Sequence, residues 1–93
     1  MSERTAASLA KLDELLVLLR ALPAGPTRDT LVETTEALRR AVAAFHMEAI
    51  RFRMHSVDRL LRPLGDGRAN DVFTQVRHEL ETAGFHTRSH AAP

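Results

Sequence analysis

The chain has no cysteine, tryptophan or tyrosine, and only four glycines and four prolines among its 93 residues. The lack of cysteine excludes a disulfide scaffold, a cysteine-ligated metal site and a cysteine nucleophile. All four aromatic residues are phenylalanines, and the sequence contains only one isoleucine and six valines. Because residues that favour strands are so few, a β-sandwich is excluded as well.

A dominant charge of one sign is also lacking, because thirteen basic residues are matched by twelve acidic ones. This balance makes neither a nucleic acid nor a membrane surface an obligatory partner. The one run that resembles a signal-peptide core, Leu15 to Leu19, is too short for a signal or for a membrane span. We therefore expect a cytoplasmic protein that makes no membrane contact.

Alanine and leucine dominate what is present, with fourteen and thirteen copies, and both favour helices. Proline and glycine cluster at 23–26 and 63–67, which divides the chain into three helical segments. We predict one all-α domain over residues 1–85. Its helices are expected at about 2–22, 28–62 and 68–83.

The last of these helices has a recognisable end. Gly84 follows it, and Phe85 stands where a Schellman motif would bring its side chain against Leu80. Residues 86–93 are polar and unpatterned. We therefore expect a flexible tail there.

The middle helix is the unusual one, because no proline or glycine interrupts the sequence between Pro26 and Pro63. Thr30 and Glu33 have the spacing of a capping box near its start. A helix of about 35 residues is roughly 50 Å long, whereas a compact monomer of this size is roughly 30 Å across. Such a helix is expected to extend beyond the core that one chain can build.

Two apolar stripes run along this helix when it is projected at about 100° per residue. The first has a coiled-coil-like pattern of small and large residues, and includes Leu31, Leu38, Val42, Phe45, Ala49 and Phe52. The second lies about 120° away on the C-terminal half, and comprises Ile50, Met54, Val57 and Leu61.

The two shorter helices cannot cover both stripes of the middle helix. We therefore predict that the first stripe is the interface of a homodimer or higher homo-oligomer, in which an antiparallel helical bundle is completed by a second copy. The alternative is a compact monomeric three-helix bundle whose middle helix is bent or broken near His46.

Arg39, His46 and Arg53 recur at intervals of seven between the two stripes. Cationic groups in line could bind an anionic ligand or a partner's carboxylates, and a histidine can change charge near neutral pH. We predict these three as the candidate ligand-binding residues. The competing interpretation is that they border a helix interface and pair with acids of the same chain. The acids considered for this pairing are Asp13, Glu14 and Glu36.

No motif for catalysis, a metal or a cofactor is found. The middle helix offers no ligand set at the spacing at which helices hold a metal ion. His78 and Glu81 have such spacing but supply only two ligands, and His86 and His90 lie in the expected tail. There is also no nucleophile elbow or phosphate-binding loop. We expect no metal, no cofactor and no enzymatic activity, and predict a protein-interaction, adaptor or regulatory module.

Nucleic-acid binding is the first alternative, because residues 39–62 contain six arginines against Glu48 and Asp58. A small dimeric helical enzyme or a binder of anionic ligands is the second.

Overall fold

Four α-helices follow one another along the chain, where the sequence predicts three. They are seen in a computed structural model whose described residues are 3–85. The helices are α1 (Glu3–Arg20), α2 (Pro26–Ala43), α3 (Met47–Leu61) and α4 (Gly67–Thr82), and a short 3₁₀ helix, η1 (Arg62–Leu64), extends α3. The all-α prediction is confirmed, and the number of helices is corrected from three to four.

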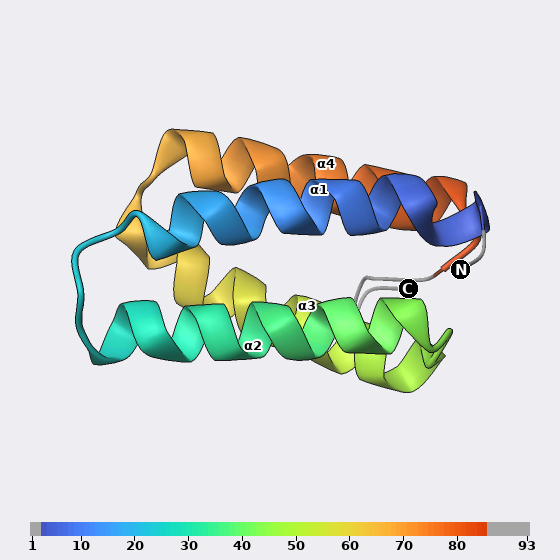
Figure 1. Cartoon of the computed structure of the whole chain (residues 1–93), viewed down its shortest axis with the longest axis horizontal. Helices are drawn as coiled ribbons and strands as arrows, with labels where there is room; N and C mark the ends of the chain where they lie inside the picture. Colours follow the sequence, from blue (N-terminus) through green and yellow to red (C-terminus); the bar gives the residue numbers. More distant parts are fainter. Residues whose placement is uncertain (1–2, 86–93) are drawn as a thin grey trace, which may run out of the picture.

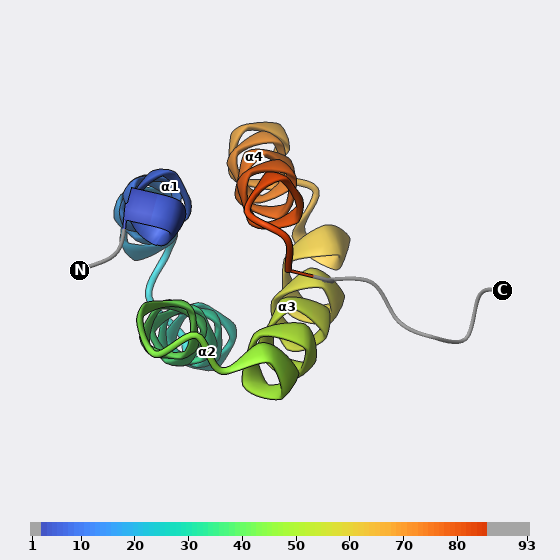
Figure 2. The same ribbon diagram turned by 90° about the vertical axis from the view of Figure 1, so that its right-hand side faces the viewer.

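Successive helices run in opposite directions and form an antiparallel bundle (Figure 1). Viewed from its end, the bundle has α1 and α2 on one side and α4 and α3 on the other (Figure 2). α1 contacts both α2 and α4, and α2 also contacts α3. α1 therefore joins the second helix of the chain to the last one.

The long middle helix predicted over 28–62 is broken into α2 and α3. α2 ends in a Schellman motif, in which the Phe45 N–H donates to the Val42 carbonyl at 3.1 Å and the His46 N–H donates to the Ala41 carbonyl at 3.0 Å. Phe45 occupies the position that glycine usually takes in this motif, with a φ of 57°. The chain turns back at this point although the sequence there contains neither glycine nor proline.

His46 caps the first turn of α3. Its Nδ1 accepts a hydrogen bond from the Ala49 N–H at 3.3 Å, which satisfies one of the free donors at the start of that helix. The prediction of one continuous helix is therefore wrong, and the break lies at the place that the alternative named.

Because of the break, no helix of the described residues extends beyond the core that one chain builds, so helix length no longer indicates a second copy. The bundle measures 34 × 33 × 19 Å, so the predicted helix of roughly 50 Å would not fit within it. With α3 folded back beside α2, one chain builds a compact core of its own.

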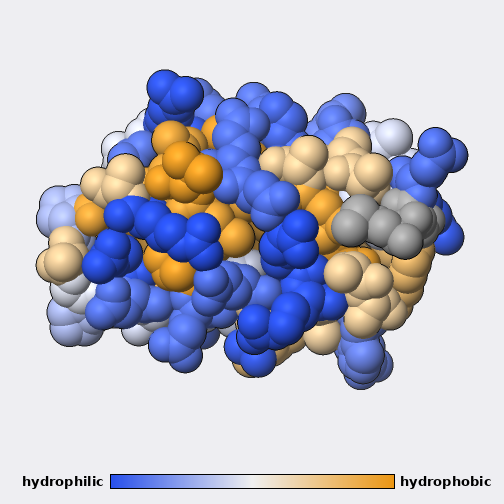
Figure 3. All heavy atoms as spheres, in the orientation of Figure 1, coloured by the Kyte–Doolittle hydropathy of each residue, from blue (hydrophilic) through white to orange (hydrophobic). Residues whose placement is uncertain are grey.

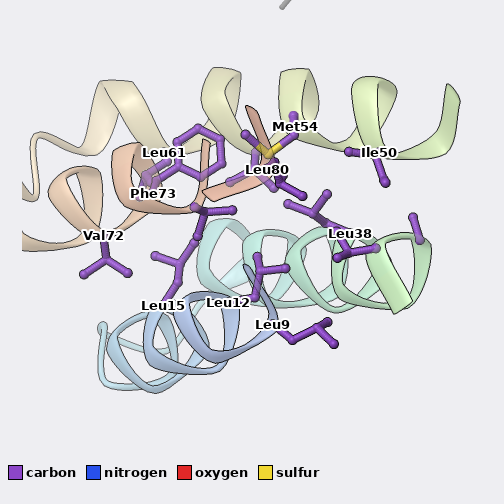
Figure 4. Close-up of a cluster of buried hydrophobic side chains, with 14 of the residues drawn as sticks. Leu9, Leu12, Leu15, Leu38, Ile50, Met54, Leu61, Val72, Phe73 and Leu80 are labelled. Carbon is purple, nitrogen blue, oxygen red and sulfur yellow. The ribbon is translucent and has the colours of Figure 1, made fainter. Parts of the chain in front are cut away.

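The core lies between the helices and is made mainly of leucine (Figure 4). Leu12 and Leu15 of α1, Leu38 of α2, Met54 of α3 and Leu80 of α4 are all fully buried there. The second apolar stripe of the sequence, Ile50 to Leu61, forms the inner side of α3.

Three of the predicted interface residues belong to this core. Leu31, Leu38 and Val42 are fully buried within the single chain, so they are not available at the surface for a second copy. Ala49 is half-buried against the core. Only Phe45 and Phe52 remain exposed, by 42% and 60%.

α4 ends as the sequence predicts. The Phe85 N–H donates to the Leu80 carbonyl at 2.9 Å, the intervening Gly84 has a φ of 96°, and the Phe85 side chain is buried. The expected tail at 86–93 and the expected helix start at Ser2 lie outside the described residues.

One buried hydroxyl in α2 predicts a stabilising substitution. Thr35 is fully buried, and its Oγ1 has no hydrogen-bond partner within residues 3–85. Replacing it with valine keeps the shape and removes the cost of burying the hydroxyl, so Thr35→Val should raise the free energy of unfolding by about 1 kcal/mol in urea denaturation. Thr35→Ala is the control and should lower it, because it leaves a cavity. A less stable valine variant would show that the hydroxyl does have a partner.

Candidate functional site

Arg39 is engaged in an ion pair with α1. Its Nε lies 2.6 Å from Asp13 Oδ1, and its second nitrogen lies 3.3 Å from Asp13 Oδ2, so the guanidinium contacts both carboxylate oxygens. This hydrogen bonding holds the pKa of the Asp13 carboxyl below its ordinary value and raises the pKa of Arg39. The interpretation that Arg39 pairs with an acid of the same chain is confirmed.

The Asp13–Arg39 pair predicts a pH dependence of stability. Because the pKa of Asp13 is lowered on folding, the pair stabilises the protein above the ordinary value of 3.8, and this contribution is lost as the pH falls through the lower folded-state value. The Asp13 side chain is 57% exposed, so solvent screening should keep the contribution below about 1 kcal/mol.

Asp13→Asn should accordingly be slightly less stable than the parent chain at pH 7, by less than about 1 kcal/mol, and the difference should vanish near pH 2. Urea denaturation at the two pH values measures this. A difference that persists at low pH would show that asparagine disturbs packing rather than charge.

His46 and Arg53 are each used in a different way. His46 caps α3 through its Nδ1, as described above. Arg53 lies on α3, with its guanidinium carbon 5.2 Å from the centre of the Phe52 ring. Within residues 3–85, no hydrogen bond, ion pair or ring contact joins any two of Arg39, His46 and Arg53. Each of the three thus has its own partner, and the break at Ala44–His46 ends the single helix on which their alignment depends.

The described part of the chain holds neither a metal-binding cluster nor a membrane-spanning helix. No three side chains of histidine, aspartate or glutamate gather there in a way that could hold a metal ion. None of the helices there is long and apolar enough to cross a membrane.

The outer side of α3 is the strongest candidate for a binding surface. Its most exposed residues recur at intervals of four, three and four, which places them in one line along the helix. We call this line the α3 outer face; it consists of Glu48, Phe52, His55 and Arg59. Phe52 is its only apolar member and the more exposed of the two phenylalanines on the surface.

Two further features surround Phe52. The Ser56 hydroxyl donates to the Phe52 carbonyl at 3.1 Å, so the serine hydroxyl is turned back onto the helix. Arg53 covers one part of the Phe52 ring. The result is an aromatic ring with an adjoining cation, a combination that is enriched in protein interfaces.

A second apolar surface lies on the opposite pair of helices. Figure 3 views the bundle from the side of α1 and α2, and apolar atoms gather near the end where α1 leads into α2. Val17 is 66% exposed in this region of the chain, and Leu18 and Val32 are half-buried against the core. Of these three residues only Val17 is exposed, and a valine side chain offers a smaller contact than an aromatic ring does.

Arg4 is the centre of a cluster of contacts at one end of the bundle, which the sequence does not predict. Arg4 Nε donates to the Ala83 carbonyl at 2.6 Å, and the Arg4 guanidinium lies 5.4 Å from the centre of the Phe85 ring. The centre of the Phe45 ring lies 6.0 Å from the centre of the Phe85 ring. Arg4 therefore connects the first turn of α1 to the residues that follow α4. These residues are far apart in sequence, and no local pattern signals the contact.

No family model matches the chain, and neither a curated protein nor a solved structure matches it.

Proposed function

We propose that this protein is a small non-catalytic helical module that binds protein surfaces, and that its first partner is a second copy of itself. The exposure of Phe52 on the α3 outer face is the observation that supports this most strongly. Burying a phenylalanine side chain that is otherwise exposed contributes about 1.5–3 kcal/mol to the free energy of association, so Phe52 can act as the centre of an interface.

The charges of the α3 outer face suit a second copy. Glu48 and Arg59 lie at the two ends of the face, with Phe52 and His55 between them. If two such helices lie antiparallel about a twofold axis, Glu48 of each copy meets Arg59 of the other, and Phe52 of each meets His55 of the other. The face is therefore complementary to itself in charge and in aromatic contact.

The first test removes the central ring. Phe52→Asp should keep the chain monomeric at concentrations where the parent chain associates, because it removes the aromatic contact with His55 of the other copy and adds a carboxylate that must lose water on association. Light scattering coupled to gel filtration measures the mass of each variant.

Val17→Asp is the matched control for this variant. It introduces the same charge at an exposed apolar position, but on α1. We expect it to associate as the parent chain does. If Val17→Asp dissociates the protein and Phe52→Asp does not, the interface lies on α1 and α2, and the assignment to α3 fails.

Nucleic-acid binding through residues 39–62 has weaker support. Arg39 is paired with Asp13 and Arg62 with Asp58, so two of the six arginines are engaged with acids of the same chain. A nucleic-acid binder would show an affinity that falls steeply with salt. Catalysis and anionic-ligand binding also have weaker support, because each of the three predicted cations has a separate contact: Arg39 with Asp13, His46 with the Ala49 N–H and Arg53 with the Phe52 ring.

A further inference from the structure

The helices are joined by three links, and only the middle one lacks residues that interrupt a helix. The link from α1 to α2 contains Pro23 and Gly25, and the link from α3 to α4 contains Pro63 and Gly65. The link from α2 to α3 consists of Ala44–His46, without glycine or proline. The sequence on the two sides of this middle link can therefore continue as one helix, whereas the other two links resist it.

The middle link is held in a conformation that its residues disfavour. Phe45 has a φ of 57°, in the left-handed region where bulky residues with a Cβ are outliers. Such a conformation persists only where the surrounding structure holds it in place. Here the visible support is the contact between the rings of Phe45 and Phe85, and Phe45 is still 42% exposed.

Straightening the link would cost no backbone hydrogen bond. In the turn, the Phe45 N–H donates to Val42 and the His46 N–H donates to Ala41. In a continuous helix the two donors simply exchange acceptors, because each N–H then bonds the carbonyl four residues before it. The straight form thus relieves the strain at Phe45 and keeps the bonds.

We propose that Ala44–His46 is a hinge, and that two copies of the chain exchange halves by opening it. In the exchanged dimer, residues 26–61 of each chain form one helix. The α1–α2 half of one chain then packs on the α3–α4 half of the other. The partner is a second copy of this chain, because only that copy carries the complementary half.

The exchange preserves the core. The contacts of α1 with α4, and of α2 with α3, join the two halves, so they are re-formed between chains with the same side chains. The contacts of α1 with α2 stay within one half. Domain exchange of this kind needs no new interface and is promoted by short, strained links. It is independent of the α3 outer face, which stays on the surface in both forms.

The decisive comparison is Phe45→Gly against Phe45→Ala. Both variants lack the ring, so they differ only in the backbone preference of the hinge. Glycine tolerates the left-handed turn and weakens the helix, whereas alanine does the reverse. In each chain, the equilibrium between the turn and the straight helix should therefore favour the straight helix about thirtyfold more for Phe45→Ala than for Phe45→Gly. Because the exchanged dimer contains two such helices, its dissociation constant should be about a thousandfold lower for Phe45→Ala. Equal dissociation constants for the two variants would overturn the proposal.

Cross-linking identifies the connectivity. Because the chain has no native cysteine, Arg4→Cys and Ala83→Cys introduce a unique pair at a contact between α1 and α4. The double variant is refolded at high concentration, its dimer fraction is linked with a short bis-maleimide, and the product is run under denaturing conditions. Exchanged halves give covalent dimers, whereas a dimer of closed chains gives monomers linked within one chain and overturns the proposal.

Phe52→Asp separates this proposal from pairing through the α3 outer face. On the Phe45→Ala background it should leave the exchanged dimer intact, because the exchange does not use Phe52. A Phe45→Ala chain that refolds at high concentration only as a monomer would refute the hinge, whatever the α3 outer face does. Loss of the Phe45→Ala dimer on addition of Phe52→Asp would refute exchange and leave the surface pairing standing.

Discussion

Replacing Leu38 with alanine should lower the free energy of unfolding of the monomer by about 3 kcal/mol. Leu38 is fully buried in the core shown in Figure 4, so the substitution removes apolar contacts and leaves a cavity that the four helices cannot fully close. Domains of this kind are stable by only about 5–15 kcal/mol, so the loss is a large part of the total. Urea denaturation followed by circular dichroism, at a concentration low enough to keep the chain monomeric, measures it.

Phe52→Ala is the matched control, because the sequence pattern places Phe52 in the same apolar stripe as Leu38. Phe52 is mostly exposed, so its loss should change the stability of the monomer by less than about 0.5 kcal/mol. If the two variants are equally stable, Leu38 does not lie in the core of a single chain. The description of α2 and α3 as two separate helices would then be wrong.

Gly84→Ala should lower the free energy of unfolding by about 1–2 kcal/mol. Gly84 has a φ of 96°, which residues with a side chain rarely adopt. In addition, a Cβ there would lie 2.8 Å from a guanidinium nitrogen of Arg4, so the arginine must move. That movement would disturb the hydrogen bond from Arg4 to the Ala83 carbonyl and the contact with the Phe85 ring.

Gly65→Ala separates the two causes. Gly65 is also left-handed, with a φ of 66°, but a Cβ there would meet nothing within 4 Å. The excess cost of Gly84→Ala over Gly65→Ala therefore reports the displacement of Arg4, and it should disappear when both are compared on an Arg4→Ala background. An excess that survives the loss of Arg4 would show that the Arg4 contact is not its cause.

The positions of α1 and α4 could be predicted because their signals are local. The leucines of α1 recur at helical spacing. Gly84 predicts where α4 ends, and the structure has the end of the helix there. The break between α2 and α3 uses the same Schellman geometry as the end of α4, but Phe45 stands where glycine would be expected. No residue type at that position signals a turn, so propensity favours the continuous helix.

A different signal for the break is nevertheless present in the sequence. The buried members of the first stripe end at Val42, and the second stripe, which begins at Ile50, lies about 120° away around the helix. We interpret this jump from the sequence as two faces of one helix, one of them for a partner. In the structure both stripes face the same core, because the turn at Phe45 reorients α3. A change in the phase of an apolar stripe within one helical segment can thus mark a turn.

The predicted ligand residues show why a column on a helix is weak evidence for a site. The spacing of Arg39, His46 and Arg53 depends on a continuous helix, and it loses its meaning once the helix is broken at His46. The pairing of Arg39 with Asp13 could be anticipated from their charges and from the short link between the first two helices. The contacts of Arg4 could not, because they depend on how the two ends of the chain meet in the folded bundle.

The proposal that the α3 outer face pairs with itself is tested most directly by mixing two charge-reversed chains. Glu48→Arg alone and Arg59→Glu alone each place like charges opposite one another in the antiparallel pair, whereas a mixture of the two chains restores opposite charges at both ends. Sedimentation equilibrium should find each variant alone near the monomer mass of 10.4 kDa and a heavier species in the equimolar mixture. A mixture that sediments as the average of its components would contradict pairing through this face.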